Sequence, residues 1–231
     1  MRKYLLAAVA IFSVAAVSNA ALAAPTLSFR VYQDNILQGA LSSSSNTGSL
    51  TTFGSTNLFS VISATAVGIP NVSAPDLVGQ STTVASNAGF TGTHTLRLEF
   101  TQTDVPSLSA GGAFASLANT LTGNLLVNAA SVQNFTVSNY ADAANVAFSR
   151  ATLLATAAFT GAGGTGAPII RNLSLPNTLF SETIVVEATF TAGGAAVNAS
   201  SQIVAVPEPA SLALFGAGLL GLGLLRRRRQ V

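Results

Sequence analysis

Residues 183–191 read Thr-Ile-Val-Val-Glu-Ala-Thr-Phe-Thr, a segment in which apolar and polar side chains nearly alternate. Ile184, Val186 and Phe190 fall on one side of the alternation. Only Val185 interrupts the polar series on the other side. A β-strand directs successive side chains to opposite faces, so the segment predicts a strand with one buried and one solvated face. Such strands are typical of antiparallel sheets.

The same alternation recurs along the chain, and turn-forming residues separate its occurrences. Clear occurrences lie at residues 26–31, 95–101 and 151–159, and weaker ones at 57–67, 123–128, 131–138 and 195–206. Segments rich in Gly, Asn or Pro lie at residues 68–71, 87–89, 161–166 and 193–194. Short strands separated by such turns predict a mainly β chain, with a single β-sandwich-like domain over residues 24–205.

Two features of this pattern leave alternatives open. Phe114, Leu117 and Leu121 fall at helical spacing, so a short helix is an alternative to a strand within residues 111–126. Five Phe-Thr pairs either form a degenerate adhesion repeat or mark strands that place a Phe inward. Their irregular spacing favours inward Phe side chains, at Phe90, Phe100, Phe135, Phe159 and Phe190.

The composition of residues 24–209 excludes several classes of function. The chain has no cysteine, so disulfides and thiolate metal sites are impossible. Six of the ten basic residues lie at the two ends. The remaining four arginines face eight carboxylates, which leaves a formal charge of about −4. A nucleic-acid partner is not expected, since phosphate binding needs clustered basic residues.

The N-terminus has the pattern of a secretory signal peptide. A basic Met-Arg-Lys start precedes an uncharged apolar run at residues 4–17. Ala21 and Ala23 then provide the small side chains that a signal peptidase recognises. We expect a signal peptide at residues 1–23 with cleavage after Ala23, or alternatively after Ala20 or Ala24. The apolar run is shorter than the roughly 20 residues of a membrane span, which favours cleavage over an anchoring helix.

The C-terminus carries a second ordered pattern. Pro207, Glu208 and Pro209 precede an apolar, Gly-rich run at residues 210–225, and a basic end of four arginines follows: Arg226, Arg227, Arg228 and Arg229. As a helix the run would extend about 24 Å, slightly less than the ~30 Å hydrocarbon core of a membrane. Arginines at its end would stay cytoplasmic, so the sequence predicts a transmembrane helix with the body outside the cytoplasm.

Residues 206–230 resemble the PEP-CTERM sorting domain of Gram-negative bacteria. The Pro-Glu-Pro triplet, the Ala-Ser that follows it, the Gly-rich apolar run and the basic end occur in the order of that family. The resemblance implies an exosortase-like membrane transpeptidase as partner, processing near Pro207-Glu208-Pro209, and transfer to the surface or matrix. It covers only the tail and implies nothing about the body. The alternative is a generic short tail anchor.

The body shows no catalytic constellation in sequence. His94 is the only histidine, and we expect it at the surface or a strand edge. No metal or cofactor site is predicted, because metal sites built from several His, or from His and Cys, are excluded by count. A paired-carboxylate site is the alternative, from Glu99, Asp104, Glu182 and Glu187 meeting across strands. Solvated strand faces are the simpler explanation of these four residues.

These observations together predict an exported protein without enzymatic activity. Its expected partners are signal peptidase and the export machinery, the exosortase-like enzyme, exopolysaccharide, and the membrane through the C-terminal helix. The expected location is the membrane first, through the tail, and then the cell surface or extracellular matrix. A surface enzyme acting on polysaccharide through a carboxylate pair, and a purely structural surface protein, are the alternatives.

Overall fold

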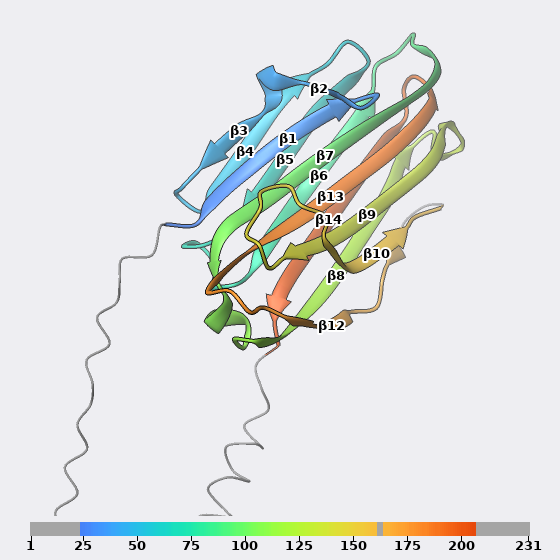
Figure 1. Ribbon diagram of the computed structural model, residues 1–231. Coiled ribbons are helices and arrows are strands. Elements are labelled where there is room, and N and C mark those ends of the chain that lie inside the picture. The colour runs from blue at the N-terminus through green and yellow to red at the C-terminus, as the bar shows by residue number, and fades with distance from the viewer. Residues whose placement is uncertain (1–23, 161–163, 207–231) are drawn as a thin grey trace, which may run out of the picture.

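The computed structural model describes residues 24–160 and 164–206 as two antiparallel β-sheets that face each other (Figure 1). Within these ranges there is no α-helix, and only three short 3-10 turns interrupt the strands, at Gly39–Leu41, Ser107–Ala110 and Ala129–Ser131. The predicted mainly β class is therefore confirmed. No helix in the described ranges is long and apolar enough to cross a membrane. The predicted signal peptide at 1–23 and the predicted transmembrane helix at 210–225 lie outside them.

Within the described residues, each sheet has seven strands. The first sheet runs in the order β10 (Thr152–Ala158), β9 (Val132–Asp142), β13 (Leu179–Ala192), β7 (Thr91–Pro106), β1 (Thr26–Gln33) and β2 (Ile36–Leu37), with β3 (Ser43–Ser45) also paired to β1. The second sheet runs in the order β11 (Gly164–Thr165), β8 (Phe114–Val127), β14 (Ala196–Ala205), β6 (Leu77–Ser86), β5 (Phe59–Val67) and β4 (Ser49–Ser55), with β12 (Ile169–Ser174) also paired to β8.

Phenylalanine side chains fill much of the space between the sheets. The five phenylalanines of the Phe-Thr pairs are all buried, as the inward interpretation predicted. The ring of Phe190 on β13 lies 5.4 Å from that of Phe59 on β5, so this contact joins the two sheets. Phe29 and Phe100 stack at 4.7 Å within the first sheet. Aromatic pairs of this kind add about 0.5–1.5 kcal/mol beyond the burial of their surface.

The ambiguous segment at residues 111–126 lies mostly in strand β8, so the helical alternative was wrong. Leu117 and Leu121 are both buried, because a spacing of four residues satisfies the strand period of two as well as the helical period. Ala115 and Asn119 are also buried on this face, a pattern that only a strand produces. The clear and weak strand predictions are confirmed, whereas six strands in the described ranges had not been predicted: β2, β3, β4, β6, β11 and β12.

A loop at residues 143–151 covers part of the outer face of the first sheet. The hydroxyl of Ser181 donates to the carbonyl oxygen of Val146 in this loop, and the Phe148 N–H donates to Oγ1 of Thr101. Val185 lies on the same outer face of β13 and is 5% exposed. Val185 is thus a buried apolar residue on the face where the alternation alone predicts a solvated polar one.

Candidate functional site

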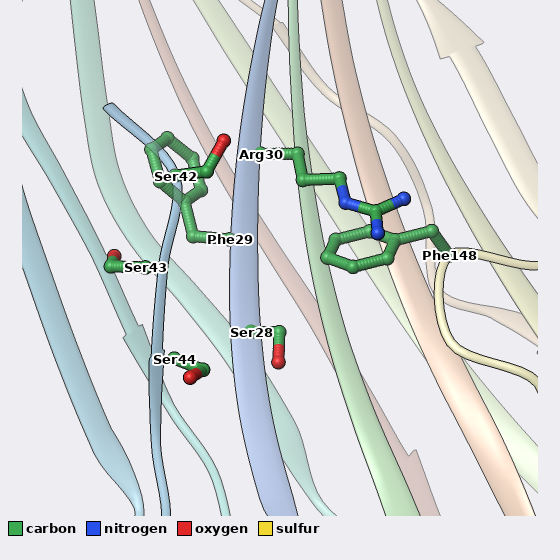
Figure 2. Close-up of a pocket in the computed structure, with 7 residues that line it drawn as sticks. All are labelled: Ser28, Phe29, Arg30, Ser42, Ser43, Ser44 and Phe148. Atoms are coloured by element: carbon green, nitrogen blue, oxygen red, sulfur yellow. The ribbon is translucent and has the colours of Figure 1, made fainter. Parts of the chain in front are cut away.

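A shallow groove lies on the outer face of β1, between β3 and the 143–151 loop (Figure 2). Its volume is about 280 Å³, and its lining residues are Ser28, Phe29, Arg30, Ser42, Ser43, Ser44 and Phe148. These residues come from β1, from β3 and the residue before it, and from the 143–151 loop. The groove therefore brings Phe148 together with two neighbouring segments, residues 28–30 and 42–44, that are far from it in the sequence.

The alternation of β1 explains why polar side chains face this groove. Leu27, Phe29 and Val31 point into the core and are at most 1% exposed. Ser28 and Arg30 point to the opposite face of the strand. Ser44 on β3 is the direct antiparallel partner of Ser28, and directly opposed residues project to the same side of a sheet.

The guanidinium of Arg30 stacks on the Phe148 ring. The Cζ atom of Arg30 lies 3.9 Å from the ring centroid, which is a cation–π contact (Figure 2). Phe148 has a positive φ of 59°, a conformation that a bulky side chain rarely adopts and that costs about 1–3 kcal/mol. Its N–H donates to Thr101 Oγ1 at 3.2 Å, which helps to hold the ring in place.

One oxygen of the carboxylate opposite Arg30 in the sheet register already accepts from two other arginines. Arg30 pairs across strands with Glu99. Glu99 Oε1, however, accepts from Nε of Arg97 at 2.9 Å and from Nη2 of Arg150. In the described parts of the chain, no carboxylate forms an ion pair with Arg30. Tyr32 lies beside these charged residues, because the Arg97 guanidinium lies 4.3 Å from the centroid of its ring.

The four carboxylates of the predicted paired site do not come together. Glu182 is completely buried and faces the core, with neither carboxylate oxygen hydrogen-bonded to the described residues. Glu99 lies on the outer face and is 4% exposed, and Glu187 lies on that same face. The expectation of solvated strand faces was therefore wrong for Glu99 and Glu182. Glu182 precedes Ile184 by two residues, so a strand directs both side chains to the same, apolar face. The burial of Glu182 could therefore have been predicted from the sequence.

Burial determines the protonation of Glu182. It raises the pKa of this carboxyl well above its usual range, and the negative charge of Asp76 raises it further. Burial also raises the pKa of Asp76, while the hydrogen bond from the backbone of Ala205 lowers it. Gln102, the antiparallel partner of Glu182, has an Nε2 atom that is buried without a hydrogen-bond partner among the described residues.

His94 lies near the start of β7 and takes part in a surface contact. Its Nδ1 atom lies 2.9 Å from Oδ2 of Asp34, and its Nε2 atom lies 3.2 Å from the Thr91 carbonyl oxygen. The other oxygen of Asp34 accepts from the Thr95 N–H. His94 thus takes part in joining the β1–β2 turn to β7, in agreement with the expected surface position.

The chain leaves the second sheet through its central strand β14. Ala205, the last residue of β14, donates its N–H to Oδ1 of Asp76 at 3.4 Å. The Val206 N–H donates to the Ser116 carbonyl oxygen at 2.9 Å, so pairing with β8 continues to the last described residue. The start of β1 and the end of β14 lie at the same end of the body (Figure 1).

The tail that follows β14 matches a known family. Residues 205–229 match the family model of the PEP-CTERM protein-sorting motif. The C-terminal tail is a PEP-CTERM sorting motif. The resemblance seen in the sequence is thereby confirmed, and the motif implies export and sorting to the surface by an exosortase.

The PEP-CTERM match contains most of the site residues that the sequence predicted. Pro207, Glu208, Pro209 and the arginines from Arg226 to Arg229 fall inside it. These residues, and the predicted signal-cleavage residues Ala21 and Ala23, lie outside the described residues. The matched motif begins at the last residue of β14, so no separate linker intervenes between the sheet and the PEP-CTERM tail.

Comparisons with whole proteins show only distant similarity. No curated protein sequence matches the chain. Among solved structures, the enzymatically active domain of tailspike protein 4 of Bacteriophage CBA120 is 8% identical, with a TM-score of 0.31, over 68% of this chain and 20% of that one. A structure of infectious bursal disease virus, Gx strain, is 15% identical, with a TM-score of 0.29, over 78% and 50% respectively. The chain thus spans about a fifth and a half of the lengths of these two proteins.

Proposed function

We propose that this PEP-CTERM protein is a non-enzymatic component of the cell surface or extracellular matrix that associates with exopolysaccharide. The observation that carries the proposal is the sorting motif directly after β14, at the end of a body rich in hydroxyl and amide side chains. Export would proceed through signal peptidase, and an exosortase would process the tail near Pro207-Glu208-Pro209.

The burial and the ion pairs of Glu99 favour a binding protein over an enzyme. A catalytic carboxylate must reach a substrate atom within about 2.6–3.2 Å. The Glu99 side chain is only 5% exposed and already pairs with Arg97 and Arg150. Glu182 lies on the opposite face of the sheet, so these two carboxylates have no shared substrate position.

Binding to the polysaccharide of the producing strain tests this proposal. The full chain, purified in detergent from envelopes, would be immobilised and exposed to that polysaccharide and to an unrelated neutral glucan. Selective binding, together with an altered matrix in a deletion strain, is the expected result. Absence of binding combined with an unchanged matrix would leave the proposal without support.

A carboxylate-pair enzyme is the second candidate. One observation favours it, namely that Glu99 and Glu187 lie on one face of the first sheet, with Arg97 directly opposite Glu187. Hydrolysis of a glycan panel that is abolished by Glu187→Gln would establish this enzyme. The non-enzymatic proposal expects no turnover by either the wild type or the variant.

A further inference from the structure

We infer that the groove at Arg30 and Phe148 is a binding subsite for the carboxylate of an acidic sugar within a polysaccharide chain. This inference rests on the proposed association with exopolysaccharide and names the chemistry recognised. Four features of the groove support it: the unpaired charge of Arg30, the fixed position of its guanidinium, the free hydroxyls around it, and the shape of the groove.

The first feature is a positive charge without a protein partner. Of the four arginines in the described parts of the chain, Arg97 and Arg150 share Glu99, and Arg171 lies on β12 of the other sheet. Arg30 is half-buried, faces the groove, and has Phe148 as its contact. Because Glu99 is neutralised by two arginines, the charge of Arg30 is left for a ligand.

The second feature is that the guanidinium is fixed before any ligand arrives. Stacking on the Phe148 ring holds its plane, and a planar guanidinium can present two parallel N–H donors to a carboxylate. Phe148 retains its strained φ of 59° in a loop bonded to Thr101 and Ser181. Backbone strain of this kind occurs preferentially at ligand-binding positions.

The third feature is the row of hydroxyls beside the guanidinium. Ser28 and Ser44 line the groove on the same face as Arg30, and neither side chain forms a hydrogen bond within the described residues. Hydroxyls both donate and accept, so they match the hydroxyl groups of a sugar ring. The groove therefore combines one fixed cation with several neutral polar groups, as an acidic sugar requires.

The fourth feature is the extent of the groove. Its volume of about 280 Å³ is slightly below the ~300 Å³ at which pockets for drug-sized ligands begin, which suits one sugar unit at a time. A second hollow of about 330 Å³ is lined by Thr26, Ser44, Ser45 and Asn46. The two share Ser44 and follow β1 from Arg30 to Thr26, about 13 Å at 3.3 Å per residue. An open polar track of this length suits a polymer better than a free monosaccharide.

Titration of the full chain with three polymers tests the inference. Polygalacturonate carries carboxylates, dextran sulfate carries sulfates, and dextran is neutral. We expect binding to polygalacturonate and not to dextran. Arg30→Gln should weaken binding to polygalacturonate about tenfold, equivalent to about 1.4 kcal/mol. Arg30→Lys should weaken it less, because the charge remains while the planar fork is lost. Raising the salt concentration should weaken wild-type binding, since the site is open to solvent.

Arg171→Gln is the matched control, because it removes the same charge from the other sheet. Far-UV circular dichroism and the unfolding temperature verify that each variant is folded. An effect confined to the Arg30 variants supports the inference. Equal losses in the Arg30 and Arg171 variants, no loss in either, or binding to dextran sulfate alone would overturn it.

Binding to the polysaccharide of the producing strain separates this inference from the proposed function. If the wild type and Arg30→Gln bind that polymer equally, the groove assignment fails and the proposed function stands. If Arg30 is needed for polygalacturonate and the strain's own polymer does not bind, the groove assignment stands and the proposed association fails.

Discussion

Replacing Glu182 with glutamine is expected to stabilise the body at neutral pH and to remove much of its dependence on pH. Glu182 is completely buried, and its two oxygens have no hydrogen-bond partner among the described residues. Burial and the charge of Asp76 raise its pKa well above the usual value near 4.5. The native protein therefore favours the neutral carboxylic acid, which glutamine resembles in size and charge.

The sign of the effect follows from proton binding. Below about pH 4.5 the carboxyl is protonated in both the folded and the unfolded chain, so it adds no pH dependence. Above that value the unfolded chain loses the proton while the folded chain keeps it. Folding then takes up a proton, so the free energy of unfolding falls as the pH rises. The fall continues until the pH reaches the raised pKa of folded Glu182.

The slope of the free energy of unfolding against pH sets the magnitude of the difference between the wild type and Glu182→Gln. One bound proton corresponds to about 1.4 kcal/mol per pH unit. For a body of this size 1 kcal/mol shifts the unfolding temperature by about 2–4 °C, so the wild type should lose roughly 3–6 °C per pH unit above pH 4.5 from this group. Glu182→Gln should match the wild type near pH 4 and exceed it increasingly at higher pH.

Thermal unfolding followed by circular dichroism between pH 4 and pH 8 measures this difference. Glu187→Gln is the control, because it removes a carboxylate from the outer face of the same strand and leaves Glu182 in place. The control should keep the wild-type slope. Parallel curves for the wild type and Glu182→Gln, or a less stable glutamine variant at pH 7, would refute the argument from burial.

Three further predictions follow from the packing of the body. Gly123→Ala should destabilise it by about 1–3 kcal/mol in urea unfolding, because the added Cβ would collide with the Phe159 ring; an unchanged midpoint would contradict this. Glu99→Gln should cost about 1–3 kcal/mol in the same assay, since two arginines lose their shared carboxylate, whereas a neutral result would show that these ion pairs are solvated. A chain ending after Val206 should unfold at the temperature of the full body, because β14 is then complete, and a clear drop in a differential scan would show that the tail supports the fold.

The sequence predicted the strands whose two faces differ in polarity. Residues 183–191 and 95–101 alternate clearly because they lie in β13 and β7, next to each other in the first sheet. Strands β4 and β6 were missed, since they contain many Ser and Thr residues and few large apolar ones, and β12 was missed because its apolar residues Ile169, Ile170 and Leu173 do not alternate. β6 and β12 pair with strands distant in the sequence, β14 and β8, whereas β4 pairs with the neighbouring β5.

The groove was not predictable from local sequence. Arg30 and Phe148 are far apart in the chain, and the loop that carries Phe148 is held beside Arg30 by long-range contacts such as those with Thr101 and Ser181. The burial of Glu182, in contrast, could be predicted, because it occupies a position where the alternation of β13 otherwise places inward, apolar side chains. The tail motif needed no structure, because the order of its residues is sufficient for recognition.

The measurement that tests the central claim most directly is the intact mass of the protein recovered separately from the cell envelope and the culture medium. The account predicts a surface or medium species that begins near Ala24 and lacks the residues after about Pro209. That species would establish export and processing of the PEP-CTERM tail. A single envelope species that retains residues 210–231 would contradict processing and leave the tail as a simple anchor.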